Sequence, residues 1–111
     1  MALTCNVPGR AATIAATATV NTLPLDHARR WRLVIENTHA SQTLTVLRLR
    51  RRTHREGPWS PWASITTGLP VAAGETITVQ PELDDCSADL DVELTASGAG
   101  TGVEFWLAGA E

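Results

Sequence analysis

Apolar and polar residues alternate one by one along most of this chain, and this period of two restricts its fold more than any other feature. The clearest run is 88–96, where every even position is apolar and the odd positions carry Asp89, Asp91, Glu93 and Thr95. A strand with this pattern buries one face and leaves the other exposed. Asp89, Asp91 and Glu93 are therefore predicted on a solvent face, and the domain is predicted to be all-β.

Seven segments with turn signals between them predict the strands of one domain. Their ranges are 13–20, 30–36, 43–52, 62–66, 76–80, 88–96 and 103–107. Short strands at intervals of about 8–12 residues are typical of sandwiches. The sequence thus predicts a single antiparallel β-sandwich of about seven strands, of immunoglobulin-like or jelly-roll type, over residues 11–111. Residues 1–10 show little periodicity and are predicted to be a loose N-terminal arm.

The phase of the alternation gives three further predictions. In 43–52 the apolar positions change from Leu44 and Val46 to Leu47 and Leu49, which predicts a β-bulge near residues 46 and 47. Trp31 is in phase with apolar neighbours and is expected in the core. By contrast, Trp106 is out of phase with Phe105 and is expected to face a partner.

Charge is divided unevenly along the chain. All nine basic residues are arginines and none lies beyond Arg55, so residues 1–55 carry a net +7 with Asp26 and Glu36 counted. The remaining residues carry ten carboxylates and no base, which gives −10. Halves of opposite charge pair either within one chain or between neighbouring subunits.

The most distinctive segment is LRLRRRTHREGPWSPWASI, residues 47–65. Its arginines at period two project from one strand face, and the two tryptophans of the WSPW sequence are placed to slot between the guanidinium groups. Three interpretations follow: a structural Arg–Trp ladder, an exposed patch that anchors a partner, or a platform on which sugars stack. The candidate interface residues are Arg48, Arg50, Arg52, Trp59 and Trp62, with Asp89, Asp91 and Glu93 as the acidic counterpart.

The sequence holds no recognisable catalytic motif. It has no G-x-S-x-G, no phosphate-binding glycine loop and no H-E-x-x-H. His27, His39 and His54 fall in predicted loops without a paired nucleophile. We therefore expect no enzymatic activity and no cofactor.

Several partner classes are also disfavoured. Asp84, Asp85, Asp89 and Asp91 lack the glycine and closing glutamate of a calcium loop, so no metal site is expected. The arginines near Trp59 are offset by an acidic pI of about 5.5, so no nucleic-acid partner is expected. No apolar run is long enough to cross a membrane, and MALTCNVPGR has no apolar signal region, so neither membrane insertion nor export is expected.

Short motifs resemble those of small β-domains in the virions of tailed bacteriophages. They are LVIENT at 33–38, LTV at 44–46, AGETI at 73–77 and an Ala/Gly/Thr-rich hairpin over 94–107. Arg-rich strands followed by Gly-x-Trp-Ser-x-Trp also occur in such proteins. The resemblance implies a capsid decoration (cement), head-spike-base or tail-associated protein.

The leading hypothesis from the sequence is therefore a non-enzymatic virion structural protein. It would bind the major capsid protein or other virion proteins, form a homo-oligomer (a trimer is favoured), and be assembled into the virion in the bacterial host cytoplasm. The alternative is a carbohydrate-binding or host-attachment module of a phage tail or fibre, with tryptophan stacked on a glycan. An accessory domain of an enzyme is a third interpretation, by analogy of fold alone.

Overall fold

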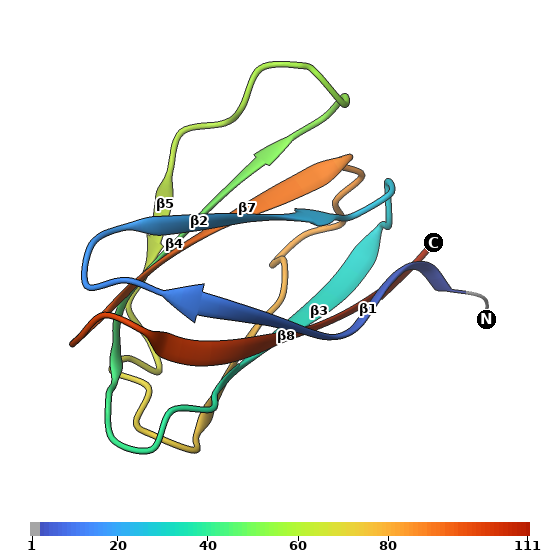
Figure 1. The fold of residues 1–111 in the computed structure, drawn as a ribbon. Coiled ribbons are helices and arrows are strands. Elements are labelled where there is room, and N and C mark those ends of the chain that lie inside the picture. The colour runs from blue at the N-terminus through green and yellow to red at the C-terminus, as the bar shows by residue number, and fades with distance from the viewer. Residues whose placement is uncertain (1–2) are drawn as a thin grey trace.

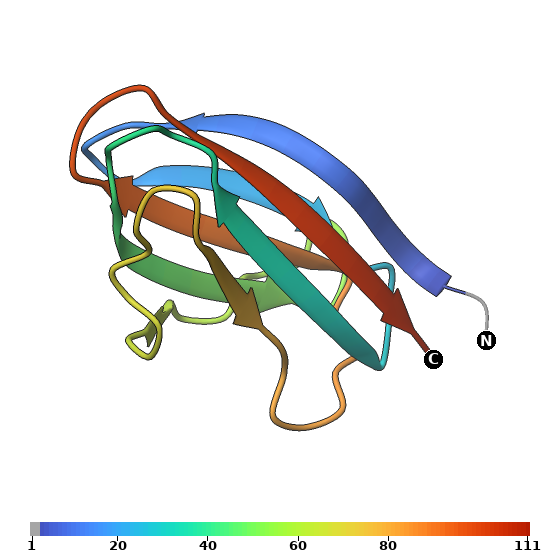
Figure 2. The same ribbon diagram turned by 90° about the horizontal axis from the view of Figure 1, so that it is seen from below.

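The computed structural model describes residues 3–111, which form two antiparallel sheets of four strands packed face to face (Figures 1 and 2). The strands are β1 (Leu3–Ile14), β2 (Thr19–Pro24), β3 (Arg30–Asn37), β4 (Leu44–Arg52), β5 (Ala63–Ile65), β6 (Thr76–Val79), β7 (Asp89–Ala96) and β8 (Thr101–Ala110). The first sheet has the order β1-β8-β3-β6 and the second β2-β7-β4-β5. The predicted all-β sandwich is confirmed, with eight strands. Within residues 3–111 no helix is long and apolar enough to cross a membrane.

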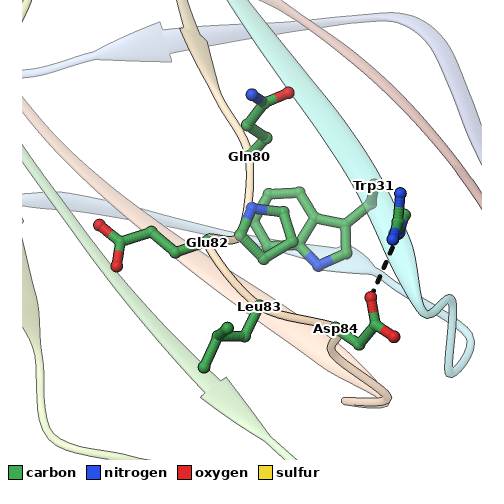
Figure 3. Close-up of a pocket in the computed structure, with 7 residues that line it drawn as sticks. Trp31, Gln80, Glu82, Leu83 and Asp84 are labelled. Atoms are coloured by element: carbon green, nitrogen blue, oxygen red, sulfur yellow. Dashed lines mark hydrogen bonds and ion pairs between the residues drawn. The ribbon is translucent and has the colours of Figure 1, made fainter.

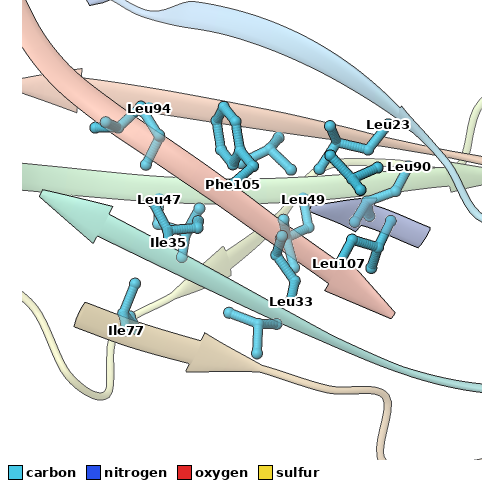
Figure 4. Close-up of a cluster of buried hydrophobic side chains, with 14 of the residues drawn as sticks. Leu23, Leu33, Ile35, Leu47, Leu49, Ile77, Leu90, Leu94, Phe105 and Leu107 are labelled. Carbon is cyan, nitrogen blue, oxygen red and sulfur yellow. The ribbon is translucent and has the colours of Figure 1, made fainter. Parts of the chain in front are cut away.

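The alternation of the sequence places the apolar side chains between the two sheets (Figure 4). Phe105 and Leu33 from the first sheet, and Leu47 and Leu94 from the second, are fully buried. Burial of each such side chain contributes about 1.5–3 kcal/mol relative to leaving it exposed. Trp31 is buried as its phase predicted. The core therefore uses one face of each sheet and leaves two outer faces for other roles.

The prediction of a loose arm over residues 1–10 is wrong for residues 3–10, which belong to β1; residues 1 and 2 lie outside the described residues. β1 pairs with β8 from Leu3 opposite Ala110 to Ile14 opposite Thr101. A bulge between Pro8 and Arg10, with Gly9 at a φ of 81°, interrupts the register. Because the bulge moves the buried positions from odd to even numbers, no single period runs through the segment.

The predicted strand over 13–20 is also wrong, because the chain turns between Ile14 and Thr19. Ala16 and Ala18 are exposed, since small side chains gain little from burial. The Thr19 hydroxyl accepts a hydrogen bond from the Ala15 amide (3.1 Å) and donates one to the Thr17 carbonyl (3.2 Å). A turn that is satisfied locally thus replaces a strand with little to bury.

The bulge predicted in β4 is confirmed by a register shift between Leu44 and Val46 against β7. Leu44, Leu47 and Leu49 all reach the core as a result. The shift sets the direction of every later side chain in the strand. It therefore points Arg48, Arg50 and Arg52 outward on the second sheet.

Candidate functional site

An alternating stack of arginines and tryptophans covers part of the outer face of the second sheet. Each ring lies between two guanidinium groups, in the order Arg52, Trp59, Arg50, Trp62, Arg48. The four successive distances from guanidinium carbon to ring centroid are 4.5, 4.8, 4.4 and 5.1 Å. We call these five residues the Arg–Trp ladder. Of the three interpretations of this segment, the structural ladder is therefore formed.

The loop that carries the tryptophans is fastened to β4 by its backbone. The Ser60 amide donates to the Arg51 carbonyl (2.8 Å), and the Arg51 amide donates to the Ser60 hydroxyl (3.0 Å). Ser60 lies between the two tryptophans of WSPW, so this reciprocal pair sets both rings against the strand. The serine of the motif thus positions the ladder.

A row of carboxylates on β7 lies beside the arginines of β4. Asp89, Asp91 and Glu93 stand opposite Arg52, Arg50 and Arg48 in register. The three ion pairs measure 2.9, 2.8 and 3.2 Å between nitrogen and oxygen. This arrangement neutralises much of the opposite charge of the two chain halves within one molecule.

The expectation that these acids lie on a solvent face is wrong for Asp89 and Asp91, which are only 5% and 2% exposed. Their side chains do point away from the core, but the arginines of β4 and the loop that carries Trp59 and Trp62 cover them. Thr22 also donates to the second Asp91 oxygen (2.5 Å). Alternation gives the face on which a side chain lies, whereas its burial depends on what covers that face.

The ladder offers little free surface for a ligand. Trp59 and Trp62 are half-buried, and each ring is engaged by two guanidinium groups. A sugar that stacked on either ring would have to displace an arginine from its carboxylate. The eight candidate interface residues are therefore brought together as one self-paired assembly, and their role in contacts with a partner stays a prediction.

A cleft of about 780 Å³ opens beside the ladder, between the edge strands β5 and β6. It adjoins a hollow of about 710 Å³ at Trp31 and the 80–84 segment (Figure 3). Most charged groups that line the two cavities are paired, Arg30 with Asp84 at 3.2 Å and Arg51 with Asp85 at 3.1 Å, whereas Glu82 takes part in no ion pair among residues 3–111. The Trp31 indole N–H donates to Asp85 (2.9 Å) and the ring is buried, so it is no stacking surface.

Asp85 joins the cleft to the second sheet through several contacts. Desolvation raises the pKa of its carboxyl, but hydrogen bonds from Trp31 and Ser87, the charge of Arg51 and the Cys86 amide outweigh it. Together they hold the pKa of Asp85 below its ordinary value of 3.8. This carboxylate therefore holds the 80–87 segment to the strands as a charged group.

The outer face of the first sheet is built differently. Trp106 on β8 is 43% exposed and stands in register between Pro8 on β1 and Val34 on β3. One row further along, Glu104 stands beside Glu36. We call this surface the Trp106 face, with the residues Pro8, Gly9, Arg32, Val34, Glu36, Thr76, Thr78, Glu104 and Trp106.

The bulge at Gly9 seats the indole of Trp106. A β-carbon built on Gly9 would lie 3.0 Å from the ring atom Cη2 of Trp106 and 3.3 Å from Oε2 of Glu104. The positive φ of Gly9 also disfavours any other residue. The missing side chain therefore lets the indole and the carboxylate converge over one point of β1.

The charges on the Trp106 face have no partner within the described part of the chain. Glu36 and Glu104 take part in none of the ion pairs formed by residues 3–111, and neither does Arg32. Arg32 lies four residues before Glu36 on the same strand, about 13 Å away at the rise of an extended chain. This face thus combines an exposed aromatic ring with unpaired polar groups.

Sequence reasoning found the outward direction of Trp106 but not the rest of this surface. The alternation of 103–107 was the signal for Trp106. The meeting of Gly9, Glu36 and Glu104 depends on the pairing of β1, β8 and β3, which are far apart in the chain. No local pattern reports such a pairing.

No protein-family model and no curated protein matches this chain. Among solved structures it is similar to chitosan-binding module 1 of a chitosanase/glucanase from Paenibacillus sp. IK-5, with a TM-score of 0.58 and 12% identity over 91% of this chain and 76% of that one. A chain of the infectious bursal disease virus Gx strain gives 0.49 at 13% identity, over 97% of this chain and 30% of that one.

The C-terminal family 22 carbohydrate-binding module of Clostridium thermocellum Xyn10B gives a TM-score of 0.43 at 13% identity, over 97% of this chain and 84% of that one. The two scores below 0.5 support no inference. The first match, at its low identity, establishes the fold alone: this chain has the small β-sandwich that also occurs as a carbohydrate-binding module. None of the three is a bacteriophage protein.

Proposed function

We propose that this chain is a non-catalytic carbohydrate-binding domain that holds a glycan on the Trp106 face. The observation that carries the proposal is Trp106 itself, a 43% exposed indole on a sheet surface. One face of a sugar ring presents C–H groups and its rim presents hydroxyls, so it matches an aromatic ring edged by polar side chains.

The register supplies the surroundings that such a ligand needs. Pro8 and Val34 lie beside Trp106 on the neighbouring strands, about 5 Å away on either side. They extend the apolar surface around the indole. Glu36, Glu104 and Thr78 surround it with hydrogen-bonding groups for hydroxyls.

The comparison with the chitosan-binding module supports the proposal at the level of architecture. That module, with the same type of fold, is described as binding chitosan, a polymer of amino sugars. A sandwich of this size is therefore sufficient for sugar binding. The same comparison favours a binding domain over an enzyme.

A glycan array probed with the wild-type protein, Trp106→Ala and Leu83→Ala tests the proposal. Leu83 is 84% exposed but lies outside the Trp106 face, so it is the matched control for loss of an exposed apolar group. We expect wild type and Leu83→Ala to bind the same glycans and Trp106→Ala to lose at least about tenfold in affinity. A blank array for the wild type, or binding unchanged in a folded Trp106→Ala, would overturn the proposal.

The resemblance to bacteriophage virion domains stays a prediction from the sequence, together with the capsid partner, the trimer and the location in the virion. The charge pairing that suggested subunit contacts is formed inside one chain instead. Native mass measured by size-exclusion chromatography with light scattering tests the trimer. A trimer that dissociates in Trp106→Ala would identify the Trp106 face as a subunit contact and count against the sugar site.

A further inference from the structure

We infer that the glycan held by the Trp106 face carries positive charge, as a sugar with a free ammonium group at C2 does. This inference rests on the proposed function. The pair of carboxylates beside the indole decides which sugar the face selects.

Glu36 and Glu104 stand directly opposite each other on β3 and β8. Both are half-buried, and like charges at directly opposite positions repel. Their other neighbours in the row are Ala11 on β1 and Thr76 on β6, neither of which carries charge. Two negative charges therefore share one row of the sheet without a compensating side chain.

The arginines of the chain are occupied elsewhere. Seven of them pair with carboxylates: Arg29, Arg30, Arg48, Arg50, Arg51, Arg52 and Arg55. Arg10 donates to the Thr22 carbonyl at 3.1 Å. The chain has no lysine. Arg30 and Arg32 both alternate onto the outer side of β3, but Arg30 pairs with Asp84. Arg32 lies about 13 Å from Glu36 along the strand.

The position of the pair relative to the indole makes it useful to a bound sugar. The Glu104 carboxylate and the Trp106 ring both approach the Gly9 bulge, so a sugar stacked on the ring has one edge beside the carboxylates. An ammonium group on that edge would offset one of the two negative charges of the row, whereas a hydroxyl or acetamido group would offset neither. Arg32 lies on the side of Trp106 opposite to the carboxylates. Its guanidinium group would donate hydrogen bonds to oxygen atoms on the other edge of the sugar, so the two edges are recognised differently and the ligand has one preferred orientation.

Three β-1,4-linked hexasaccharides that differ only at C2 test the inference by isothermal titration calorimetry: cellohexaose (hydroxyl), the glucosamine hexamer (ammonium) and the N-acetylglucosamine hexamer (acetamido). We expect the glucosamine hexamer to bind about fivefold more tightly than the other two at low salt. The advantage should shrink in 0.5 M salt, because mobile ions screen partly exposed charges.

The variants separate charge from stacking. Glu36→Gln and Glu104→Gln should each reduce the ratio of glucosamine-hexamer affinity to cellohexaose affinity, because each removes one of the two negative charges and keeps a side chain that can hydrogen-bond a hydroxyl. Glu56→Gln, an exposed carboxylate on the loop after β4, is the matched control and should change nothing. Trp106→Ala should weaken whatever binding the three sugars show.

Each outcome bears on one of the two proposals. Equal binding of cellohexaose and the glucosamine hexamer, lost in Trp106→Ala, would overturn this inference and leave the proposed function standing. A lysine hexapeptide that bound as tightly as the glucosamine hexamer would also overturn it, because the site would then recognise charge alone. If no hexasaccharide bound and the glycan array were blank, both proposals would fail.

Discussion

The two outer faces of the sandwich carry the same kinds of residue in opposite states. On the second sheet, arginines, tryptophans and carboxylates engage one another: every ring lies between guanidinium groups and every ladder arginine has a carboxylate. On the first sheet, a tryptophan, two glutamates and an arginine share a face without an ion pair among the described residues. One face is closed on itself, and the other is open.

A high density of motif residues is therefore a poor guide to a binding surface. The segment 47–65 holds the most conspicuous pattern in the chain, and its tryptophans and arginines are engaged by one another and by carboxylates from elsewhere in the same chain. The strand β8, which has no conspicuous motif, carries the exposed indole of Trp106. What matters for binding is whether the chain itself supplies partners for these groups.

The largest expected effect is on the closed face. Asp91→Ala should lower the free energy of unfolding by about 3 kcal/mol. The substitution leaves the Arg50 guanidinium, which the rings of Trp59 and Trp62 partly cover, without its carboxylate. Urea denaturation measures the change. Glu104→Ala on the open face is the matched comparison, and we expect a change of no more than about 0.5 kcal/mol. Equal losses at the two sites would abolish the distinction between the faces.

Removal of a tryptophan should likewise cost more stability on the ladder face than on the Trp106 face. Trp59→Ala removes two cation–π contacts and should cost about 2 kcal/mol of stability. Trp106→Ala removes a ring with no such contact and should cost less than about 1 kcal/mol. Thermal unfolding of both variants checks this. A larger loss for Trp106→Ala would show that its ring is structural.

Acid should weaken the attachment of the 80–87 segment to the strands, because that attachment depends on the charge of Asp85. Because the folded-state pKa of Asp85 lies below 3.8, its contribution to stability is present above that pH and is lost as the pH falls through the folded-state pKa. Asp85→Asn should therefore be less stable than wild type at neutral pH, and its melting temperature should fall less steeply below about pH 4. Melting curves between about pH 2 and 6 test this; parallel curves would contradict it.

The smallest expected effect is a gain. Glu36→Gln removes the repulsion from Glu104 and should stabilise the protein by about 0.3 kcal/mol in low salt. In 1 M salt the gain should nearly vanish, because the charges are then screened. Urea denaturation at both salt concentrations measures it. A loss of stability would mean that Glu36 has a favourable partner.

Much of the fold was predictable because alternation reports directly which side chains face the core. The strands β3, β4 and β7 follow it closely, and the bulge in β4 was visible as a change of phase. β1 escaped prediction because its own bulge divides a long strand into two short runs of opposite phase. The Ala/Thr run after it alternates without enough apolar bulk to hold a strand.

The candidate site was less accessible to sequence reasoning. The ladder was predictable, since arginines at period two and nearby tryptophans lie within one short segment. The burial of Asp89 and Asp91 was not, because it depends on a loop that folds back over a neighbouring strand. The Trp106 face requires the register of three strands from both ends of the chain, and that register is set by the whole core.

The pairing of β1 with β8 also has a mechanical consequence. The two strands are antiparallel and begin their pairing at Leu3 and Ala110, so both ends of the described chain leave the molecule side by side (Figure 2). Tension applied through those ends would peel the strands apart one hydrogen-bonded pair at a time instead of shearing all pairs together. Gly9 and Trp106 lie on the two strands that separate first. A glycan on the Trp106 face, where we propose that one binds, would therefore be released under load while the ladder on the other sheet stayed intact.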